Sequence, residues 1–246
     1  MKANSASLTL YHFEPGHHRE VCIWHDQDHK PEVVGTTPHI FISQRWVATP
    51  ALLAEQPPSQ LEHHGGEYVN LYWSSGTTSE LESNFALLGE RLTLLGRMQP
   101  MRYIHRTWGS RLVPVSVHAR PGLELSAEAA TFAPQTSGLM VVILKLLESN
   151  VREGYASWHE TVHVPMILET GLITAAVKLG SPADPDLVVM LYYTDHADPC
   201  AAYREFHTAE RSWRHSDKDF ADIERARHVI HSGMYIPSIG HYEYYD

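Results

Sequence analysis

The segment WHDQDHKPE, residues 24–32, is the most informative about the fold because a close copy of it occurs later in the chain. Residues 158–166 read WHETVHVPM, so the tryptophan, both histidines and the proline recur in the same register. A match of chemically distinctive residues at one constant offset is typical of an internal duplication. The sequence therefore predicts one structural unit written twice.

A second match lies downstream of the first. VNLYW at residues 69–73 aligns with VMLYY at residues 189–193, and the offset is shorter here than at the first match. The first half must therefore carry extra residues between its two motifs. We assign them to residues 55–66, where Pro57-Pro58 and Gly65-Gly66 are turn signals.

Hydrophobic periodicity predicts a similar order of elements in each half. The first half is expected to contain a strand at 8–13, a helix at 19–34, strands at 40–48 and 67–74, a helix at 80–97 and a strand-rich segment at 103–118. The second half is expected to contain a strand at 139–146, a helix at 152–169, strands at 172–179 and 187–194, a helix at 199–214, a further helix at 219–231 that Gly233 ends, and a final strand at 234–244.

The order β-α-β-β-α-β defines the ferredoxin-like unit. One such unit leaves an apolar sheet face bare, and a second unit can cover that face. We therefore predict an α+β protein in which tandem ferredoxin-like repeats, residues 1–118 and 138–246, close over each other as an intramolecular barrel. Residues 119–137 would form the linker between them.

Composition limits the classes of partner. The 246 residues carry a formal net charge of -10, whereas binding to nucleic acid or to an anionic membrane requires a basic face. Only two cysteines are present, and neither a signal peptide nor an apolar stretch of membrane-spanning length is recognisable. We expect a cytoplasmic protein, monomeric or homodimeric, whose partner is a small molecule.

The motif resembles a known family. WHDQDHKPE, with a hydrophobic strand that begins eight residues after Glu32, resembles the first helix of dimeric α/β-barrel proteins and is most similar to the EthD-like branch. The resemblance implies a ferredoxin-like fold. The superfamily includes lactone isomerases, polyketide cyclases, lyases, and haem-degrading and cofactor-free monooxygenases, so the fold does not fix the reaction. Two departures matter: usual members carry one unit per chain, and Met166 stands where the first half has Glu32.

The histidines of the motif are the candidate acid–base groups. His25 and His29 share one helical face with Glu32, and imidazole titrates near neutral pH. The resemblance implies that a histidine of this helix faces a pocket. We therefore assign His25 as general acid or base, His29 and Glu32 as orienting residues, and Tyr72 as the group that binds a substrate carbonyl. A second interpretation of His29 is that it bonds a backbone carbonyl freed by the following proline.

A further set of residues is assigned to substrate binding: Trp24, Arg45, Trp46, His159, His163 and Tyr192. Strand alternation places Tyr68, Asn70 and Tyr72 on one face of their strand. Because aromatic residues favour strands, Tyr72 and Tyr192 could equally be core residues, and an exposed edge would equally explain Arg45.

A metal site is the rival chemistry for these histidines. H-x-x-x-H on a helix can chelate, with Glu32 as a third ligand. Against this, His25 is followed by Asp26 rather than by glutamate, and the second half lacks the carboxylate. We expect neither a metal nor a cofactor. The leading hypothesis is an enzyme that uses histidine acid–base catalysis on an apolar, aromatic or polyketide-like substrate, as an isomerase, cyclase or lyase. The alternatives are a cofactor-free or haem-using monooxygenase and a non-catalytic ligand-binding barrel.

Overall fold

The first half forms one antiparallel sheet of four strands. The computed structural model describes residues 2–123, 126, 128–129, 132, 136–148, 151–216 and 218–238. The strands of the first sheet are β1 (Ser5–Phe13), β2 (Ile40–Val47), β3 (Tyr68–Ser74) and β4 (Ile104–Ala119). They lie side by side in the order β4-β1-β3-β2. This is the strand order expected of a ferredoxin-like unit.

The second half repeats this sheet. Its strands are β5 (Gly138–Leu146), β6 (Ala175–Gly180), β7 (Leu187–Thr194) and β8 (Arg227–Pro237), in the order β8-β5-β7-β6. The end of β4 pairs with β6 from Val113 to Ala119, and the end of β8 pairs with β2 at Trp46 and Val47. These two seams close an eight-stranded barrel. The predicted fold class, tandem ferredoxin-like repeats in one barrel, is confirmed.

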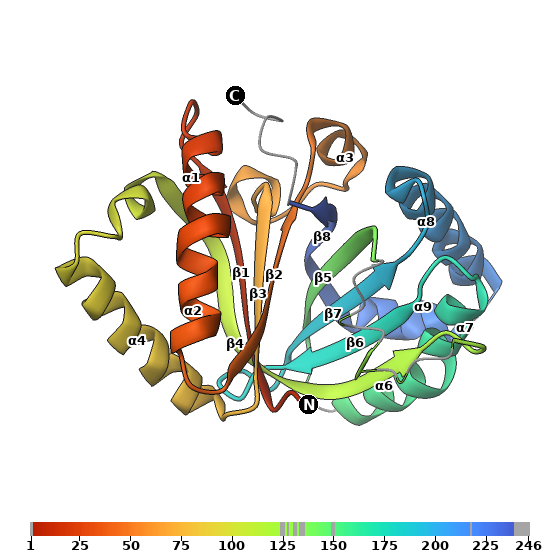
Figure 1. Cartoon of the computed structure of the whole chain (residues 1–246). Coiled ribbons are helices and arrows are strands. Elements are labelled where there is room, and N and C mark those ends of the chain that lie inside the picture. Colours follow the sequence, from red (N-terminus) through yellow and green to blue (C-terminus); the bar gives the residue numbers. More distant parts are fainter. Residues whose placement is uncertain are drawn as a thin grey trace.

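Helices cover the outside of the barrel on two flanks (Figure 1). The first half supplies α1 (His18–Trp24), α2 (Lys30–Thr36), α3 (Pro50–Glu55) and α4 (Thr78–Leu94), and the second half supplies α6 (Arg152–Trp158), α7 (Val164–Glu169), α8 (Pro199–Ser216) and α9 (Lys218–Arg225). Short 3-10 helices span Glu62–Gly65 and Gln99–Tyr103. Within the described residues, none of these helices has the length and apolar character needed to cross a bilayer.

The duplicated motif forms a π-helical turn in both halves. His25–His29 joins α1 to α2, and His159–His163 joins α6 to α7. The N–H of Lys30 bonds the carbonyl of His25, and the N–H of Val164 bonds that of His159. A proline follows each turn, and a proline inside a helix lacks an N–H and collides with the preceding turn. The wider π-turn accommodates it, so the helices predicted over 19–34 and 152–169 are continuous but widened at the histidines.

The core lies inside the barrel and is shared by both halves. Val69, Leu71 and Trp73 point inward from β3, as the alternation predicted. Trp46 of β2 packs against Tyr193 of β7, with ring centroids 6.1 Å apart. The other face of β3, with Tyr68, Asn70 and Tyr72, lies under the helices, where Asn70 and Tyr72 reach His25. Each sheet therefore has one face in the common core and one face beneath its own helices.

Two predicted elements need correction at the end of the chain. The helix expected over 219–231 ends at Arg225, because residues 227–231 instead begin β8, where Val229 pairs with Leu144 and His231 with Ile143. Pairing along the buried edge of β5 outweighs the local helical pattern. The expected final strand, 234–244, is described only to Pro237 within β8; residues 239–246 lie outside the described residues. The predicted linker, 119–137, is described only in part.

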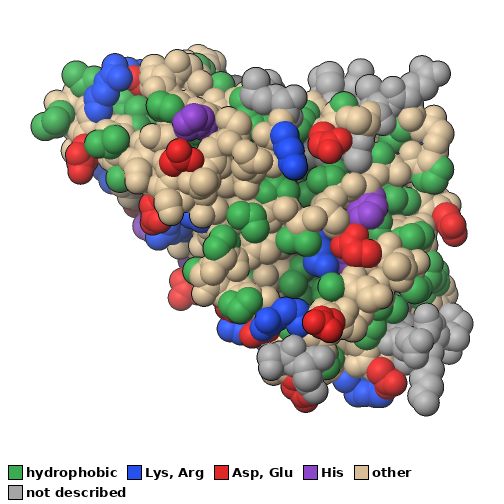
Figure 2. Space-filling view, turned by 90° about the horizontal axis from the view of Figure 1, so that it is seen from below, with side chains coloured by type: hydrophobic (Ala, Val, Ile, Leu, Met, Phe, Trp, Pro, Cys, Tyr) green, Lys and Arg blue, Asp and Glu red, His purple; other side chains and the backbone are tan. Residues whose placement is uncertain are grey.

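The surface at one end of the barrel mixes charges of both signs. Figure 2 shows this face with acidic, basic and hydrophobic side chains interspersed rather than gathered by type. Proteins that bind nucleic acid concentrate their basic residues on one face. The described part of this face carries no such basic stripe.

Candidate active site

The two π-turns hold their aromatic side chains in matching geometry. Trp24 stacks on His29 with ring centroids 4.7 Å apart and an interplanar angle of 18°. Trp158 stacks on His163 at 4.6 Å and the same angle. The paired imidazoles are 5.5 Å apart in the first half and 5.7 Å apart in the second. The two halves therefore present equivalent histidine pairs toward equivalent sheets.

His25 is buried against the sheet in the first half. Its ring is 2% exposed, and its Nε2 lies 2.6 Å from the Nδ2 donor of Asn70 and 3.5 Å from the hydroxyl of Tyr72. Its Nδ1 lies 3.5 Å from Asp26. Burial lowers the pKa of His25 to about 3 despite the nearby carboxylate. The ring is therefore neutral at physiological pH and already bonded to the protein.

A buried ion pair supports this cluster. Arg45 is 3% exposed and binds both carboxylate oxygens of Asp26, at 3.0 and 2.7 Å. Burial raises the pKa of Asp26, but hydrogen bonds from His25 and Arg45 outweigh it and hold that pKa well below its usual value. The guanidinium also reaches the thiol of Cys22 at 3.4 Å and lies over the ring of Tyr68. Polar side chains therefore fill the space between helix and sheet in this half.

The remaining first-half candidates lie elsewhere. Glu32 pairs with Arg97 at 2.8 Å rather than with an imidazole, and the carboxylate beside His25 belongs to Asp26. Trp24 stacks on His29 and donates its Nε1–H to the carbonyl of Arg97. Trp46 points into the barrel core, on the opposite face from His25. The structure thus brings His25, Tyr72 and Arg45 together, and it separates Glu32 and Trp46 from them.

Several of the same positions in the second half carry side chains that are either smaller or less polar. Strand pairing places Met190 opposite Lys178 where the first half has Asn70 opposite Arg45. It also places Leu144 and Val188 where the first half has Tyr11 and Tyr68. Because the aromatic rings and their hydrogen bonds are gone, the space beneath the helices is no longer filled.

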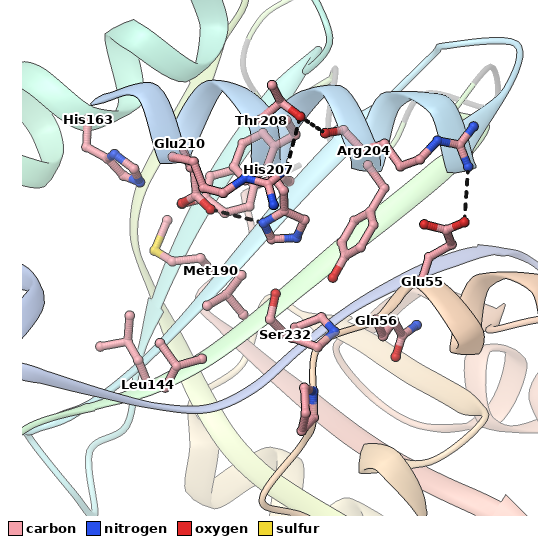
Figure 3. Close-up of a pocket in the computed structure, with 18 of the residues that line it drawn as sticks. Glu55, Gln56, Leu144, His163, Met190, Arg204, His207, Thr208, Glu210 and Ser232 are labelled. Carbon is pink, nitrogen blue, oxygen red and sulfur yellow. Dashed lines mark hydrogen bonds and ion pairs between the residues drawn. The ribbon is translucent and has the colours of Figure 1, made fainter. Parts of the chain in front are cut away.

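A pocket of about 690 Å³ lies there, between α8 and strands β5, β7 and β8 (Figure 3). Its floor is largely apolar, with Val142, Leu144, Met190 and Val229. One wall comes from the other half of the chain, because residues 55–58 of the first-half insertion line it. The expected insertion therefore serves the pocket of the opposite repeat.

A histidine and a carboxylate face each other on the helical side of this pocket. His207 Nδ1 lies 3.3 Å from Glu210 Oε2, one helical turn along α8. The Nε2 of His207 is buried and has no hydrogen-bond partner among the described residues. Figure 3 shows the ring pointing from the helix into the space above Met190 and Ser232, with Glu210 beside it. Sequence reasoning missed this pair, although its i, i+3 spacing on a predicted helix was a visible signal.

Of the residues assigned from sequence, His163 and Tyr192 line this pocket. His163 is 2% exposed and stacked on Trp158, and Tyr192 packs near Phe206 with ring centroids 5.7 Å apart. Burial raises the pKa of Tyr192 well above its usual value, so its phenol stays protonated. His159 lies behind the pocket wall with no measurable exposure, and burial lowers its pKa.

The described residues offer no donor set for a metal. Within the described residues, no three or more histidine, cysteine, aspartate or glutamate side chains converge in a geometry that could hold a metal ion. In the first half, Asp26 is committed to Arg45 and Glu32 to Arg97, so neither carboxylate joins the histidine pair as a ligand.

Sequence comparison identifies no relatives: no family model and no curated protein matches the chain. Solved structures do match. A chlorite dismutase from Candidatus Nitrospira defluvii is 11% identical, with 97% of this chain and 92% of that chain covered and a TM-score of 0.59. An anthrone oxidase-like protein is 9% identical, with 96% and 92% covered and a TM-score of 0.59. A protein named as a candidate monooxygenase from Fusobacterium nucleatum subsp. nucleatum is 6% identical, with 96% and 93% covered and a TM-score of 0.53.

At such low identity these matches establish the fold alone. They cover nearly the whole of both chains, so the likeness includes both repeats and the way they close. Together with the strand order, they show that the chain has the fold of the dimeric α/β-barrel proteins, with two ferredoxin-like units joined in one polypeptide.

Proposed function

We propose that the chain is a small-molecule enzyme whose active site is the pocket beneath α8, where His207 transfers a proton to or from an apolar, aromatic or polyketide-like substrate. One observation carries this proposal. His207 has a carboxylate 3.3 Å from Nδ1, while its buried Nε2 has no hydrogen-bond partner among the described residues and belongs to the pocket wall. The apolar floor suits a substrate with few polar groups.

The pairing with Glu210 gives His207 a defined role. A carboxylate next to Nδ1 favours the tautomer with its proton on that nitrogen, which leaves the lone pair on Nε2 free to accept a proton. The carboxylate also stabilises the imidazolium that forms. His207 is therefore suited to act first as a base and then as an acid.

Two phenols in the pocket complete the chemistry. Tyr192 and Tyr203 both line it, and burial raises the pKa of each above its usual value. Both side chains therefore remain hydrogen-bond donors at neutral pH. A donor at a substrate carbonyl stabilises the enolate that forms when an adjacent proton is removed. Isomerisation, cyclisation and lyase reactions of such compounds share this first step.

Oxidation without a cofactor is the second candidate. Two structural neighbours favour it, an anthrone oxidase-like protein and a candidate monooxygenase. The same base would deprotonate a hydroquinone, whose anion gives two electrons to dioxygen and yields a quinone and hydrogen peroxide. Oxygen uptake with a hydroquinone, lost in His207→Gln, would distinguish this reaction from isomerisation.

Haem is the cofactor that the likeness to dimeric α/β-barrel proteins suggests. The residues fit it in one respect: a histidine with a carboxylate beside Nδ1 and an Nε2 without a hydrogen-bond partner among the described residues is suited to bind iron. His207 would then hold the iron, and His163 is the other imidazole on the pocket wall. Bound haem would supply redox chemistry. A Soret band that depends on His207 would reveal it.

Proton exchange tests the main proposal without knowledge of the substrate. The α-protons of 2-tetralone, an aromatic ketone, are followed by NMR in D2O. We expect the protein to accelerate exchange over buffer, and His207→Gln to reduce that acceleration by about 10²–10⁴-fold. Glu210→Gln should leave an intermediate rate, because Nε2 remains but its tautomer is no longer favoured.

The matched control is His228→Gln, which alters an exposed histidine that contacts Gln60 outside the pocket. Its exchange rate should equal that of the unmodified protein. Binding of 2-tetralone without any acceleration of exchange would instead support a non-catalytic ligand-binding barrel.

A further inference from the structure

Arg227, the first residue of β8, is a buried cation in the wall of the pocket beneath α8. Its side chain is 7% exposed. One terminal nitrogen lies 3.6 Å from Glu224 Oε1, which is longer than an ordinary hydrogen bond. Its Nε is buried and has no hydrogen-bond partner among the described residues. The guanidinium is therefore only partly satisfied by the protein.

The groups around Arg227 keep it charged. Burial lowers its pKa, but Tyr155, Glu210, Glu224 and Tyr192 act in the opposite direction and the net result is a raised pKa. A buried guanidinium with an unbonded N–H is costly to the protein. Its planar fork matches the two oxygens of a carboxylate. A ligand with a carboxylate would supply the missing acceptor.

The charge of the whole lining also favours an anion. Three arginines line the pocket (Arg204, Arg211 and Arg227), against two glutamates (Glu55 and Glu210). Arg204 and Glu55 pair with each other at 3.4 Å on exposed side chains, and Glu210 is engaged with His207. The pocket therefore carries an excess of positive charge in a chain whose formal net charge is -10.

We infer that this pocket binds an apolar, aromatic compound that carries a carboxylate, and that Arg227 binds the carboxylate. The inference rests on the proposed function in one respect, that the pocket beneath α8 is the active site. The apolar side chains Val142 and Val229, which keep exposed surface in the pocket, receive the ring system, and His207 stands on the helical side of the same space. A carboxylate anchored at Arg227 fixes how the ring presents its protons to that histidine.

Calorimetric titration tests this inference directly. The probes are benzoate, 2-naphthoate and anthracene-9-carboxylate, each compared with its methyl ester. We expect at least one acid to bind about tenfold or more tightly than its ester, because the ester cannot accept a charge-assisted pair of hydrogen bonds. Arg227→Gln should remove that preference, and Arg227→Lys should keep part of it, since it retains the charge but loses the fork.

The matched control is Arg225→Gln, which removes an exposed arginine that does not line the pocket and pairs with Asp222 on α9. It should leave the preference unchanged. The comparison of acid with ester is made on the unmodified protein, so it remains valid even if a variant fails to fold. Equal affinity for acids and esters, failure of every acid to bind, or a preference that survives Arg227→Gln would each overturn the inference. Binding of haemin alone would overturn it in favour of a haem site.

The outcome is separable from that of the proposed function. His207→Gln should keep the preference for acid over ester, even if it changes both affinities, because it leaves Arg227 in place. An acid preference that depends on Arg227, in a protein that does not accelerate proton exchange, would uphold the inference and reject the proton-transfer role. Proton exchange that depends on His207, without any acid preference, would do the reverse.

Discussion

The space between helix and sheet is filled in the first half of the chain and open in the second. In the first half, Asp26, Arg45, Cys22 and Asn70 bond to one another or to His25 beneath the helix. In the second half, Met190 replaces Asn70, and the same region opens into a pocket of about 690 Å³. Both halves keep the π-turn, the tryptophan and the two histidines. The motif therefore marks the shared fold, and the side chains opposite it decide whether a ligand can enter.

In the filled half, burial removes water from the charges of Asp26 and Arg45, which is energetically costly. A buried ion pair contributes only if its partners are completely bonded, and breaking one side is far more damaging than losing a surface pair. The open half replaces most of these polar groups with apolar ones. Its buried cations, Arg227 and Lys178, lie 3.6 and 3.5 Å from their nearest carboxylates, which are looser contacts than those of Arg45. Retention of the acidic residue Glu32 in the first half does not indicate which half holds the pocket, because Glu32 binds Arg97 rather than an imidazole.

Acid should have the largest effect, and it should act on both halves. Burial lowers the pKa of His25 to about 3, and those of His29 and His231 to about 4, and it also lowers that of His159. Below pH 6.5 these histidines become protonated in the unfolded chain but stay neutral in the folded protein. The free energy of unfolding therefore falls as pH falls, by up to about 1.4 kcal/mol per pH unit for each histidine. Urea unfolding between pH 7 and 4 should show a steep loss of the free energy of unfolding.

Replacing one histidine at a time shows how much each half contributes to this pH dependence. His25→Leu and His159→Leu should each reduce the slope of stability against pH between about 6 and 4. Asp26 contributes little to this window, because its pKa is lowered and its contribution is lost only below its ordinary value of 3.8. A slope that neither variant changes would show that these two rings are not buried neutral in the folded protein.

The next largest effect is expected when the carboxylate beside the first histidine of each motif is removed, and the loss of stability should differ between the two halves. Asp26→Ala leaves Arg45 buried without its partner, and we expect a loss of about 3–5 kcal/mol in the free energy of unfolding. Glu160→Ala is the matched variant: Glu160 is 27% exposed and lies 3.5 Å from Lys178. We expect a loss of about 1–2 kcal/mol there, from its bonds to Ser116 and His118. Equal losses, measured by urea unfolding, would contradict the contrast between a filled and an open half.

The repeat and its strands could be predicted because they depend on local pattern. Tryptophan, histidine and proline are distinctive enough to reveal the duplication, and period-two alternation correctly separated Val69, Leu71 and Trp73 from Tyr68, Asn70 and Tyr72. The segment assigned to the insertion, residues 55–66, runs from the end of α3 through irregular chain into the 3-10 helix at Glu62–Gly65.

The pocket beneath α8 could not be predicted, because it depends on the space left between elements that are distant in sequence. It opens where Leu144 and Met190 replace larger or polar first-half side chains, and its wall comes from residues 55–58 of the opposite repeat. The role proposed for His207 rests on the burial of its Nε2, which no spacing in the sequence reveals. The assignment of residues 227–231 to helix failed for a similar reason, since pairing with β5 is a tertiary interaction.

The smallest effect is expected at the ion pair that joins the halves across the pocket mouth. Glu55 and Arg204 are 42% and 52% exposed, so solvent screens their attraction. We expect Glu55→Gln to change the free energy of unfolding by no more than about 0.5 kcal/mol and to leave acid binding intact, with Gln60→Glu as a control that adds a charge to the same insertion. The halves are held together by main-chain pairing at the β2–β8 and β4–β6 seams and by their common core, none of which this substitution touches. A loss above about 2 kcal/mol in urea unfolding would mean that the insertion, rather than the seams, fixes how the two repeats close.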